Sequence, residues 1–376
     1  MKVKIILAGS AKGTGLLYHL TYLAINFSSN FKNTKYSFLL LSEKNEQETG
    51  LWRLIEENLS PNEYVACNSS LDFIGVVESY LNDDHYSNVI YLTQGLKQFS
   101  NTIKLKRTFK KKLILYTRLN SFKHGTNYRK PLSFYYSFLF RRYADVVNFQ
   151  CNSTIRQFSN SKIILEKGNY TVIPLGINNP EVISDPDKRK LNSIMQDDKI
   201  FKIVYLAQFH KHKRHSELIN AINQYLQEKN DVKLIFLGEG IEMQNVKDQI
   251  KSADIENKVY FAGRINRKYI PFYLKNSNLS IVLSKNETFG HNILEPLFYG
   301  VPVITSDVGI ASDIIKDFFN GFVLRSTDMN KLPGIVKSFE NNYDKQLVKS
   351  TSNLYTWENT VIAYENLFDY LLKRTH

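Results

Sequence analysis

Short apolar runs alternate with amphipathic stretches along the first half of the chain. Runs rich in β-branched and large apolar residues, bounded by polar or glycine-containing turns, predict strands at 3–7, 36–41, 88–92, 113–117 and 146–149. Apolar residues at helical spacing predict helices at 16–27, 51–58 and 74–81, although Gly75 weakens the start of the third. Strands and helices in alternation favour crossover connections and a parallel sheet.

The same alternation restarts after a polar, charged stretch near 178–200, which we interpret as a linker. Strands are predicted at 202–206, 233–237, 259–261, 279–283 and 302–305, with helices at 216–227, 243–250, 270–275 and 292–299. A one-faced helix follows at 357–373. The whole pattern predicts an α/β protein of two doubly wound, Rossmann-like domains in tandem.

Length and composition agree with two packed domains. The chain has 376 residues, 43% of them hydrophobic, which is more than one core usually supports and too apolar for a disordered protein. Cys67 and Cys151 lie far apart, which argues against a disulfide framework or a zinc site and favours a reducing cytoplasm. The apolar start is shorter than a signal peptide requires, and no run approaches the roughly 20 residues of a spanning helix, so we expect a soluble protein.

Positive charge is concentrated in the first half of the chain. The net charge is +13, of which residues 1–175 carry +11, and no acidic residue occurs between Asp84 and Asp145. This asymmetry indicates an anionic partner, whether phosphates, nucleic acid or a membrane surface, unless the surface is simply basic and solvated. The segment 131–142 joins aromatic residues to Arg141 and Arg142, which suits a helix in the interface of an anionic bilayer or a buried helix with basic ends.

A glycine-containing loop follows the first predicted strand. In Gly9-Ser-Ala-Lys-Gly13-Thr-Gly15 the glycines allow a ligand to approach the backbone, and the start of the next helix favours a phosphate. The glycine spacing differs from a dinucleotide-binding fingerprint, and no Lys-Ser or Lys-Thr follows as in a phosphate-binding P-loop. A purely structural tight turn is the alternative.

A second loop, between the predicted strand 279–283 and the helix 292–299, combines an anion site with two carboxylates. Free N–H groups at the helix start can hold an anion without a metal. Glu287 lies in the loop and Glu295 in the helix, where carboxylates facing a crevice can accept hydroxyl hydrogen bonds from a ribose or a hexose. Capping or pairing on the helix surface is the alternative for Glu295, which its apolar neighbours Leu294 and Leu297 disfavour.

These residues belong to a longer pattern. Glu287-x7-Glu295 followed by Pro-Leu-Phe-Tyr-Gly300-Val-Pro302-Val-Ile-Thr-Ser-Asp-Val-Gly309 resembles the donor-binding signature of the retaining GT-B glycosyltransferases, glycosyltransferase family 4. The segments 171–178, 261–264, 313–321 and 355–358 resemble further parts of that family in the right order. The resemblance implies an acceptor-binding domain at 1–175 and a nucleotide-sugar-binding domain at 176–355, facing a central cleft. A C-terminal helix at 356–376 would cross back to the first domain.

The resemblance also implies roles for individual residues. Glu287 would contact the donor sugar as a catalytic residue, Glu295 would hold the ribose, and Arg264 would lie beside the base. The other implied donor-binding positions, several of them through the backbone, are Gly13, Gly15, Phe289, Gly290, His291 and Asn292.

One phosphate-binding motif departs from the family. Its Gly-Arg-x-x-x-x-Lys is Ala207-Gln208-x-x-x-x-Lys213 here, so Lys213 matches the lysine, Gln208 replaces the arginine, and Arg214 is placed to compensate. A fixed cation is needed because departure of a nucleoside diphosphate builds negative charge. A metal would be the other solution. The one Asp-x-Asp, at 185–187, lies among basic residues in the expected linker, so we expect no metal and no other cofactor.

Histidines near the expected site are assigned to substrate. Asn120 and His124 are the alternatives for the polar residue that the family places near the transferring carbon, and His124 is favoured. Basic neighbours make phosphate a better partner than a metal for His210, His212 and His215. The family's front-face reaction retains configuration and gives the acceptor's proton to the leaving phosphate; Glu287 as a covalent nucleophile is a less favoured use of that residue.

We therefore expect a cytoplasmic glycosyltransferase that uses a UDP- or GDP-sugar to extend a bacterial surface polysaccharide, such as a lipopolysaccharide or capsule repeat. The saccharide acceptor would be lipid-linked, as on undecaprenyl diphosphate, and the basic first domain would hold the enzyme at the inner face of the membrane. A nucleotide-sugar epimerase of the same architecture is the main alternative. A nucleic-acid-binding protein would explain the charge but not the glutamate pair, and an inactive sugar-binding relative would explain Gln208.

Overall fold

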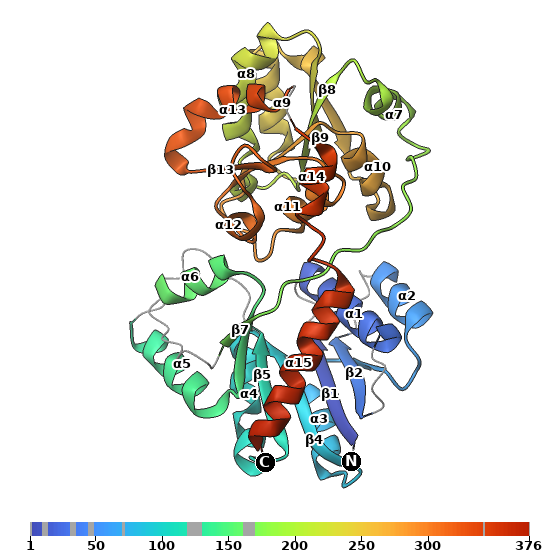
Figure 1. Ribbon diagram of the computed structural model, residues 1–376, viewed down its shortest axis with the longest axis vertical. Helices are drawn as coiled ribbons and strands as arrows, with labels where there is room; N and C mark the ends of the chain where they lie inside the picture. The colour runs from blue at the N-terminus through green and yellow to red at the C-terminus, as the bar shows by residue number, and fades with distance from the viewer. Residues whose placement is uncertain are drawn as a thin grey trace. The chain divides into compact units, whose positions relative to one another are not determined.

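The structure is a computed structural model that describes residues 2–9, 14–30, 35–43, 49–69, 72–118, 130–160, 170–340 and 343–375. It divides into two compact units, the first formed by Met1–Gly176 with Tyr355–His376 and the second by Ile177–Leu354. Each unit contains one parallel sheet covered by helices (Figure 1). The α/β class and the two Rossmann-like sheets expected from the sequence are confirmed.

The sheet of the first unit has the strand order β3-β2-β1-β4-β5-β6-β7. Its strands are β1 (Lys2–Gly9), β2 (Tyr36–Glu43), β3 (Tyr64–Cys67), β4 (Tyr86–Gln94), β5 (Leu113–Arg118), β6 (Val146–Phe149) and β7 (Tyr170–Val172). All five strands predicted for this half form. The two edge strands, β3 and β7, were not predicted, because each is short and mostly half-buried and therefore has a weak apolar pattern.

Successive residues of these strands face opposite layers of helices. The helices are α1 (Thr14–Asn30), α2 (Thr49–Asn58), α3 (Asp72–Asn82), α4 (Gly95–Thr108), α5 (Lys130–Tyr143), α6 (Asn152–Asn160) and α15 (Trp357–Thr375). Leu115 belongs to the core that packs on α3, α4 and α5, whereas the next residue, Tyr116, lies edge-on to Tyr364 of α15 with ring centroids 6.0 Å apart. The sequence analysis did not predict α4, whose basic residues interrupt its apolar stripe.

Helix α15 returns to the first unit and completes its core, as the sequence led us to expect. The Trp357 ring stacks on Tyr22 of α1 at 6.1 Å, and Tyr364 lies edge-on to Phe27 at 5.7 Å. Where α15 begins, Gly176 lies so close that an added Cβ would be 2.3 Å from the Trp357 nitrogen. A side chain at 176 would therefore separate the end of the first segment of this unit from its returning helix.

The sheet of the second unit has the order β10-β9-β8-β11-β12-β13. Its strands are β8 (Phe201–Leu206), β9 (Val232–Leu237), β10 (Val259–Gly263), β11 (Leu279–Val282), β12 (Val303–Ser306) and β13 (Gly321–Leu324). Its helices are α7 (Arg189–Gln196), α8 (His215–Glu228), α9 (Met243–Ser252), α10 (Ile270–Lys275), α11 (His291–Phe298), α12 (Ala311–Ile314), α13 (Leu332–Ser338) and α14 (Lys345–Ser350), with short 3-10 turns η1 (Lys211–Lys213), η2 (Glu256–Lys258), η3 (Arg267–Tyr269) and η4 (Ser326–Lys331).

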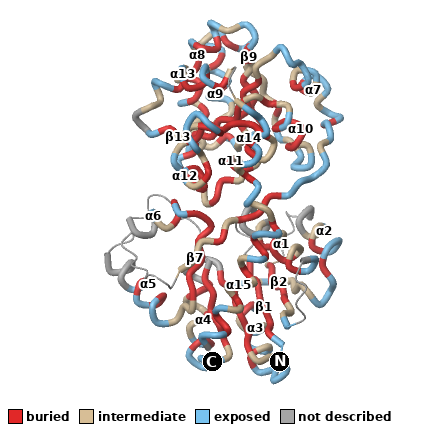
Figure 2. The backbone as a smooth tube through the Cα atoms, viewed as in Figure 1, coloured by how far each residue is buried: buried red, intermediate tan, exposed pale blue. Residues whose placement is uncertain are grey.

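Alternation along β8 assigns the helices of this unit to two layers. Ile203 packs in the core formed with α8, α9 and α13, whereas Val204 packs with α7 and α10. The central strands of both sheets are accordingly buried along most of their length (Figure 2). Cys67 and Cys151 are buried free thiols. No helix in the described part of the chain is long and apolar enough to cross a membrane.

The polar stretch near 178–200 is more than the linker that we expected from the sequence. It contains α7, which buries Leu191 and Met195 against the second sheet. Asp185, which we placed in that linker, is 4% exposed, and its carboxylate accepts a hydrogen bond from the Asp187 nitrogen at 3.0 Å. Leu191 and Met195 are buried and Ile194 packs half-buried against the same core, and the polar residues around these three conceal the helix in the sequence.

Replacing Gly176 by alanine should destabilise the first unit, because only a backbone shift can relieve the contact with Trp357. Overpacking of this kind costs about 1–3 kcal/mol. Both tryptophans, Trp52 and Trp357, belong to this unit, so denaturant unfolding followed by tryptophan fluorescence measures the loss. Gly75→Ala in α3 is the control: its Cβ meets nothing within 4 Å, and alanine is favoured in a helix by about 0.5–1 kcal/mol. Equal stability of Gly176→Ala and wild type would refute the close packing of α15.

Candidate active site

The candidate active site lies where the sheet order of the second unit reverses. Strands β8 and β11 are neighbours and run parallel, although two strands and their helices separate them in sequence. The loops that follow their carboxyl ends therefore start side by side, which is where open α/β sheets bind ligands. The β8 loop carries Lys213, and the β11 loop carries Glu287.

The Glu287 carboxylate gathers three donors on one oxygen. Its Oε1 accepts hydrogen bonds from Lys213 Nζ at 2.6 Å, Ser284 Oγ at 2.7 Å and Asn292 Nδ2 at 3.0 Å. The side chains of Lys213 and Glu287 are 16% and 15% exposed, so water screens the pair only partly. The arrangement fixes both the ammonium group of Lys213 and the carboxylate of Glu287 beyond the carboxyl ends of β8 and β11. The sequence predicted Asn292 as a backbone contact, whereas its amide side chain is what reaches Glu287.

A buried hydroxyl braces the two loops behind this ion pair. Tyr205 is fully buried at the end of β8; its hydroxyl donates to the Lys213 carbonyl and accepts from the Leu283 nitrogen at 3.0 Å. Lys285 adds a second link, because its nitrogen donates to the His212 carbonyl at 2.8 Å. The loops of β8 and β11 are thus tied through backbone groups as well as through charge. Tyr205 was not predicted as a site residue, since a tyrosine inside an apolar strand gives no sign of which polar groups it will contact.

The start of α11 presents backbone N–H groups beside Glu287. Gly290 precedes the helix at φ 91°, a left-handed conformation that glycine adopts without strain. The Phe289 side chain is buried, and its carbonyl accepts the Ile310 nitrogen at 2.7 Å, so the loop after β12 supports this turn. The first N–H groups of α11, at His291 and Asn292, are those that an α-helix does not use internally. They form a site suited to an anion.

Glu295 faces a cation one helical turn further on. Arg267 Nη2 lies 3.0 Å from Glu295 Oε1, and the Glu295 side chain is 18% exposed. Burial raises the pKa of this carboxyl, and the Arg267 charge opposes the rise. Arg267 was not predicted, although it follows Arg264 by three residues on the loop after β10. The pairing that we gave as the alternative for Glu295 therefore occurs, and it leaves the carboxylate oriented and close to the surface.

In the described ranges, the other residues predicted to bind phosphate or the base do not bond to the Glu287 carboxylate. Gln208 and Arg264 are exposed, and neither side chain bonds to another residue in the described ranges. Arg214 is half-buried at φ 57° and links η1 to α8. The glycine loop Gly238–Gly240 packs closely against the backbone of the loop that follows β8 and contains Gln208. A Cβ on Gly240 would lie 2.5 Å from the Phe209 carbonyl oxygen. This glycine loop was not predicted from the sequence.

The expectation of a phosphate contact is wrong for one of the three histidines. His215 is 2% exposed and stacks on Phe209 with centroids 4.0 Å apart, while its ring lies 4.7 Å from that of Tyr205. As the first residue of α8, it lies in the core against Phe209 and Tyr205 and not at the surface with His210 and His212. His210 and His212 stay outside and stack on each other at 5.8 Å. No group of metal-ligating side chains occurs within the described ranges.

The predicted residues of the first unit lie mostly outside the described residues. Gly13, Asn120 and His124 are among those outside, so their roles stay predictions. Gly15 belongs to the first turn of α1. The assembled part of the site is thus in the second unit, where a fixed ammonium group, a carboxylate and a helix start converge. Such a set can neutralise a phosphate and accept hydrogen bonds from hydroxyl groups.

Comparison with known proteins identifies related sequences and folds. Residues 187–353 match the family described as Glycosyl transferases group 1. N-acetyl-alpha-D-glucosaminyl L-malate synthase of Bacillus anthracis is 26% identical over 186 residues, which are 48% of each chain. Alpha-monoglucosyldiacylglycerol synthase of Streptococcus pneumoniae is 28% identical over 180 residues, 46% of this chain and 40% of that protein. The chain thus spans less than half the length of these curated relatives.

A solved structure extends the likeness to the whole chain. Anabaena HepE in complex with UDP superimposes with a TM-score of 0.73 over 98% of this chain and 100% of its own, at 20% sequence identity. At that identity the likeness concerns the fold. The fold class inferred from the sequence is the same as that of this structure, and the family match covers the unit that contains Lys213 and Glu287.

Replacing Tyr205 by phenylalanine should loosen the two loops. The change leaves the Lys213 carbonyl and the Leu283 nitrogen without their buried partner, which costs about 1–3 kcal/mol of unfolding free energy. A double-mutant cycle on stability should also show a smaller coupling between Lys213 and Glu287. Tyr225→Phe is matched, because it removes an equally buried hydroxyl bonded to Glu340. It should lower stability and leave that coupling intact; the same loss of coupling in both variants would contradict the bracing role.

Stability should depend on pH through His215. Burial, assisted by the Lys213 charge, lowers its pKa from 6.5 to about 4. Between these values the unfolded chain binds a proton that the folded chain excludes. The contribution is therefore complete above pH 6.5 and is lost as pH falls to about 4, by up to about 3 kcal/mol. Urea unfolding at several pH values should show that His215→Phe removes this part of the dependence. His85→Phe, at an exposed position, should retain it, and an unchanged profile for His215→Phe would rule the assignment out.

Proposed function

With the match of residues 187–353 to the Glycosyl transferases group 1 family as the premise, we propose that this chain is a glycosyltransferase. It moves a sugar from a nucleotide diphosphate donor, UDP- or GDP-linked, to a saccharide acceptor. The observation that carries the proposal is the contact between Lys213 and Glu287 beside the start of α11. A cation and the backbone N–H groups at a helix start suit a diphosphate, and the adjacent carboxylate suits the hydroxyls of a sugar.

The charges of this site support a reaction in which the diphosphate leaves. The bond between the anomeric carbon and the phosphate oxygen breaks, and the acceptor oxygen bonds to the same face of that carbon, so configuration is retained. The acceptor's proton passes to the leaving phosphate. Lys213 and the N–H groups of α11 stabilise the charge that develops on the phosphate, in the place that a divalent ion would otherwise take. Glu287 orients both Lys213 and the sugar.

The two glutamates bind opposite ends of the donor molecule. Glu287 is fixed by three donors and faces the sugar, while Glu295, held by Arg267, accepts the ribose hydroxyls. The raised pKa of Glu295 means that its carboxylate form is favoured less than that of an exposed glutamate. The acceptor is a lipid-linked intermediate of a bacterial surface polysaccharide. Two observations support this part: the basic first half of the chain and the similarity to a synthase whose name specifies a diacylglycerol product.

The proposal predicts transfer that depends on Lys213 and Glu287 and does not require a metal. Lys213→Met and Glu287→Gln should each lower turnover about 100-fold or more, because each removes a charge that the leaving diphosphate or its partner requires. The measurement is nucleoside diphosphate release from UDP- and GDP-sugars with saccharide acceptors, in the presence of EDTA. Nuclear magnetic resonance of the product then reports the anomeric configuration.

The ion pair between Lys229 and Glu340 provides the matched control. Its atoms lie 2.8 Å apart in the same unit, away from the loops of β8 and β11. Lys229→Met and Glu340→Gln should therefore affect stability while retaining turnover. A donor sugar that is altered without an acceptor would indicate the epimerase instead. Full activity of Glu287→Gln, or an absolute need for a divalent metal, would contradict the proposed site.

A further inference from the structure

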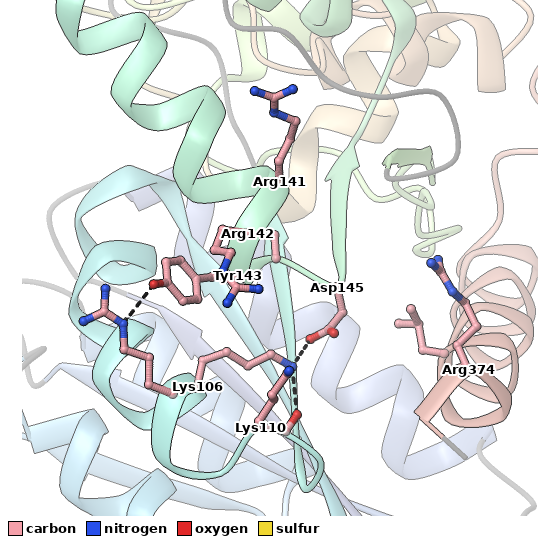
Figure 3. A pocket seen from close by; sticks show the side chains of 10 residues that line it. Lys106, Lys110, Arg141, Arg142, Tyr143, Asp145 and Arg374 are labelled. Atoms are coloured by element: carbon pink, nitrogen blue, oxygen red, sulfur yellow. Dashed lines mark hydrogen bonds and ion pairs between the residues drawn. The ribbon is translucent and has the colours of Figure 1, made fainter.

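A basic cavity of about 550 Å³ lies in the first unit between the ends of three helices (Figure 3). Six of its ten lining residues are Lys or Arg, contributed by α4, α5, α15 and the turn after α4. Its cations are Lys106, Arg107, Lys110, Arg141, Arg142 and Arg374. The cavity has the volume of a small-ligand site, and its charge selects for anions.

The one acidic residue of this basic cavity is already neutralised. Asp145 accepts Lys106 Nζ at 2.6 Å and the Leu115 nitrogen at 2.6 Å. Lys106 also donates to the Leu113 carbonyl at 2.5 Å and is 7% exposed, so this pair is part of the framework. In the described part of the chain, no carboxylate pairs with Lys110, Arg142 or Arg374. The cavity therefore retains a positive charge that lacks a partner.

The basic cavity is separate from the edge of the sheet that holds substrate loops. It is built where α4 leads into β5 and α5 leads into β6, at the amino ends of those strands. Loops that bind substrates follow the carboxyl ends of parallel strands, at the opposite edge. The acceptor chemistry of this unit therefore does not explain the six cations.

The exposed face of α5 next to this cavity carries aromatic side chains, which indicate the kind of anion that binds there. Tyr135 and Phe138 are 53% and 55% exposed and lie three residues apart on this helix, so they form an exposed aromatic pair. Arg142 follows Phe138 by four residues and Tyr135 by seven, so all three share one helical face. Aromatic side chains next to arginines are typical of helices at the surface of an anionic bilayer.

We propose that the basic cavity binds the phosphate of an anionic phospholipid while Tyr135 and Phe138 enter the bilayer interface. Arginine suits this role, since its planar fork can donate two hydrogen bonds to one phosphate. Arg142 and Arg374 approach the cavity from different helices, with Asp145 between Lys106 and Arg374 in the view of Figure 3. The inference rests on the proposed function for the presence of a membrane and assigns the surface that contacts it.

Sedimentation of the full chain with vesicles tests the inference. Vesicles of phosphatidylcholine mixed with the anionic lipid phosphatidylglycerol are compared with vesicles of phosphatidylcholine alone. The wild-type chain should bind only the anionic vesicles, and less well as salt is raised. Arg142→Glu with Arg374→Glu should weaken binding at least about tenfold, and Tyr135→Ser with Phe138→Ser should weaken it several-fold.

Lys251→Glu with Lys349→Glu is the matched control. Both lysines are exposed in the last turns of α9 and α14, as Arg142 and Arg374 are in the last turns of α5 and α15, and the total change in charge is equal. Lys349 also stands over a ring, that of Phe298 at 5.7 Å, as Arg374 stands over Tyr370 at 5.6 Å. Binding that falls equally in this control would show a response to net charge alone and overturn the site.

Two further measurements separate the possible failures. Inorganic pyrophosphate that raises the melting temperature of the wild type but not of Arg142→Glu with Arg374→Glu, without any vesicle binding, would replace the lipid by a small phosphate and overturn the inference. Binding of UDP in the absence of vesicles should be equal in the wild type and in that variant. If the variant loses vesicle binding and still binds UDP, the lipid-binding surface is supported independently of the donor site. Loss of both kinds of binding would refute the claim that the basic cavity is separate from the donor site.

Discussion

The ion pair between Lys213 and Glu287 joins two loops that could not meet in another strand order. Its two residues follow β8 and β11, which become neighbours only because the sheet grows from β8 in both directions. A fixed cation beside a carboxylate is stable here because Ser284 and Asn292 share the same carboxylate oxygen, and because water is partly excluded. The rest of the site is arranged around that contact, with Tyr205 behind it.

The same contact sets the condition for ligand binding. In the structure the Lys213 ammonium is bonded to Glu287, so a phosphate must share Lys213 with a carboxylate that is already in place. Sharing costs less than creating the site anew, since the two remaining donors continue to hold Glu287 when Lys213 turns toward an anion. The neutral pair also avoids leaving an isolated buried charge when no ligand is bound.

The two units differ in how many of their charged side chains are paired with a side chain of opposite charge. In the second unit, charged residues of the candidate site form two ion pairs, Lys213 with Glu287 and Arg267 with Glu295. The first unit carries most of the net charge, and its basic cavity retains cations without carboxylate partners. Helix α15 bears one of those cations, Arg374, and its aromatic residues pack on α1. The returning helix therefore both completes a core and helps to build a charged surface.

The sequence by itself determined the α/β class, ten of the strands and the loops on which Lys213 and Glu287 lie, because apolar periodicity records which faces are buried. It did not determine the half-buried edge strands β3, β7 and β13, nor α7, whose apolar positions are too few to stand out. Tertiary structure alone decided that His215 turns into the core, that Tyr205 bridges two loops and that Arg267 meets Glu295. The physical reason is that polar contacts depend on loop conformation and on which strands become neighbours, and neither leaves a periodic trace in the chain.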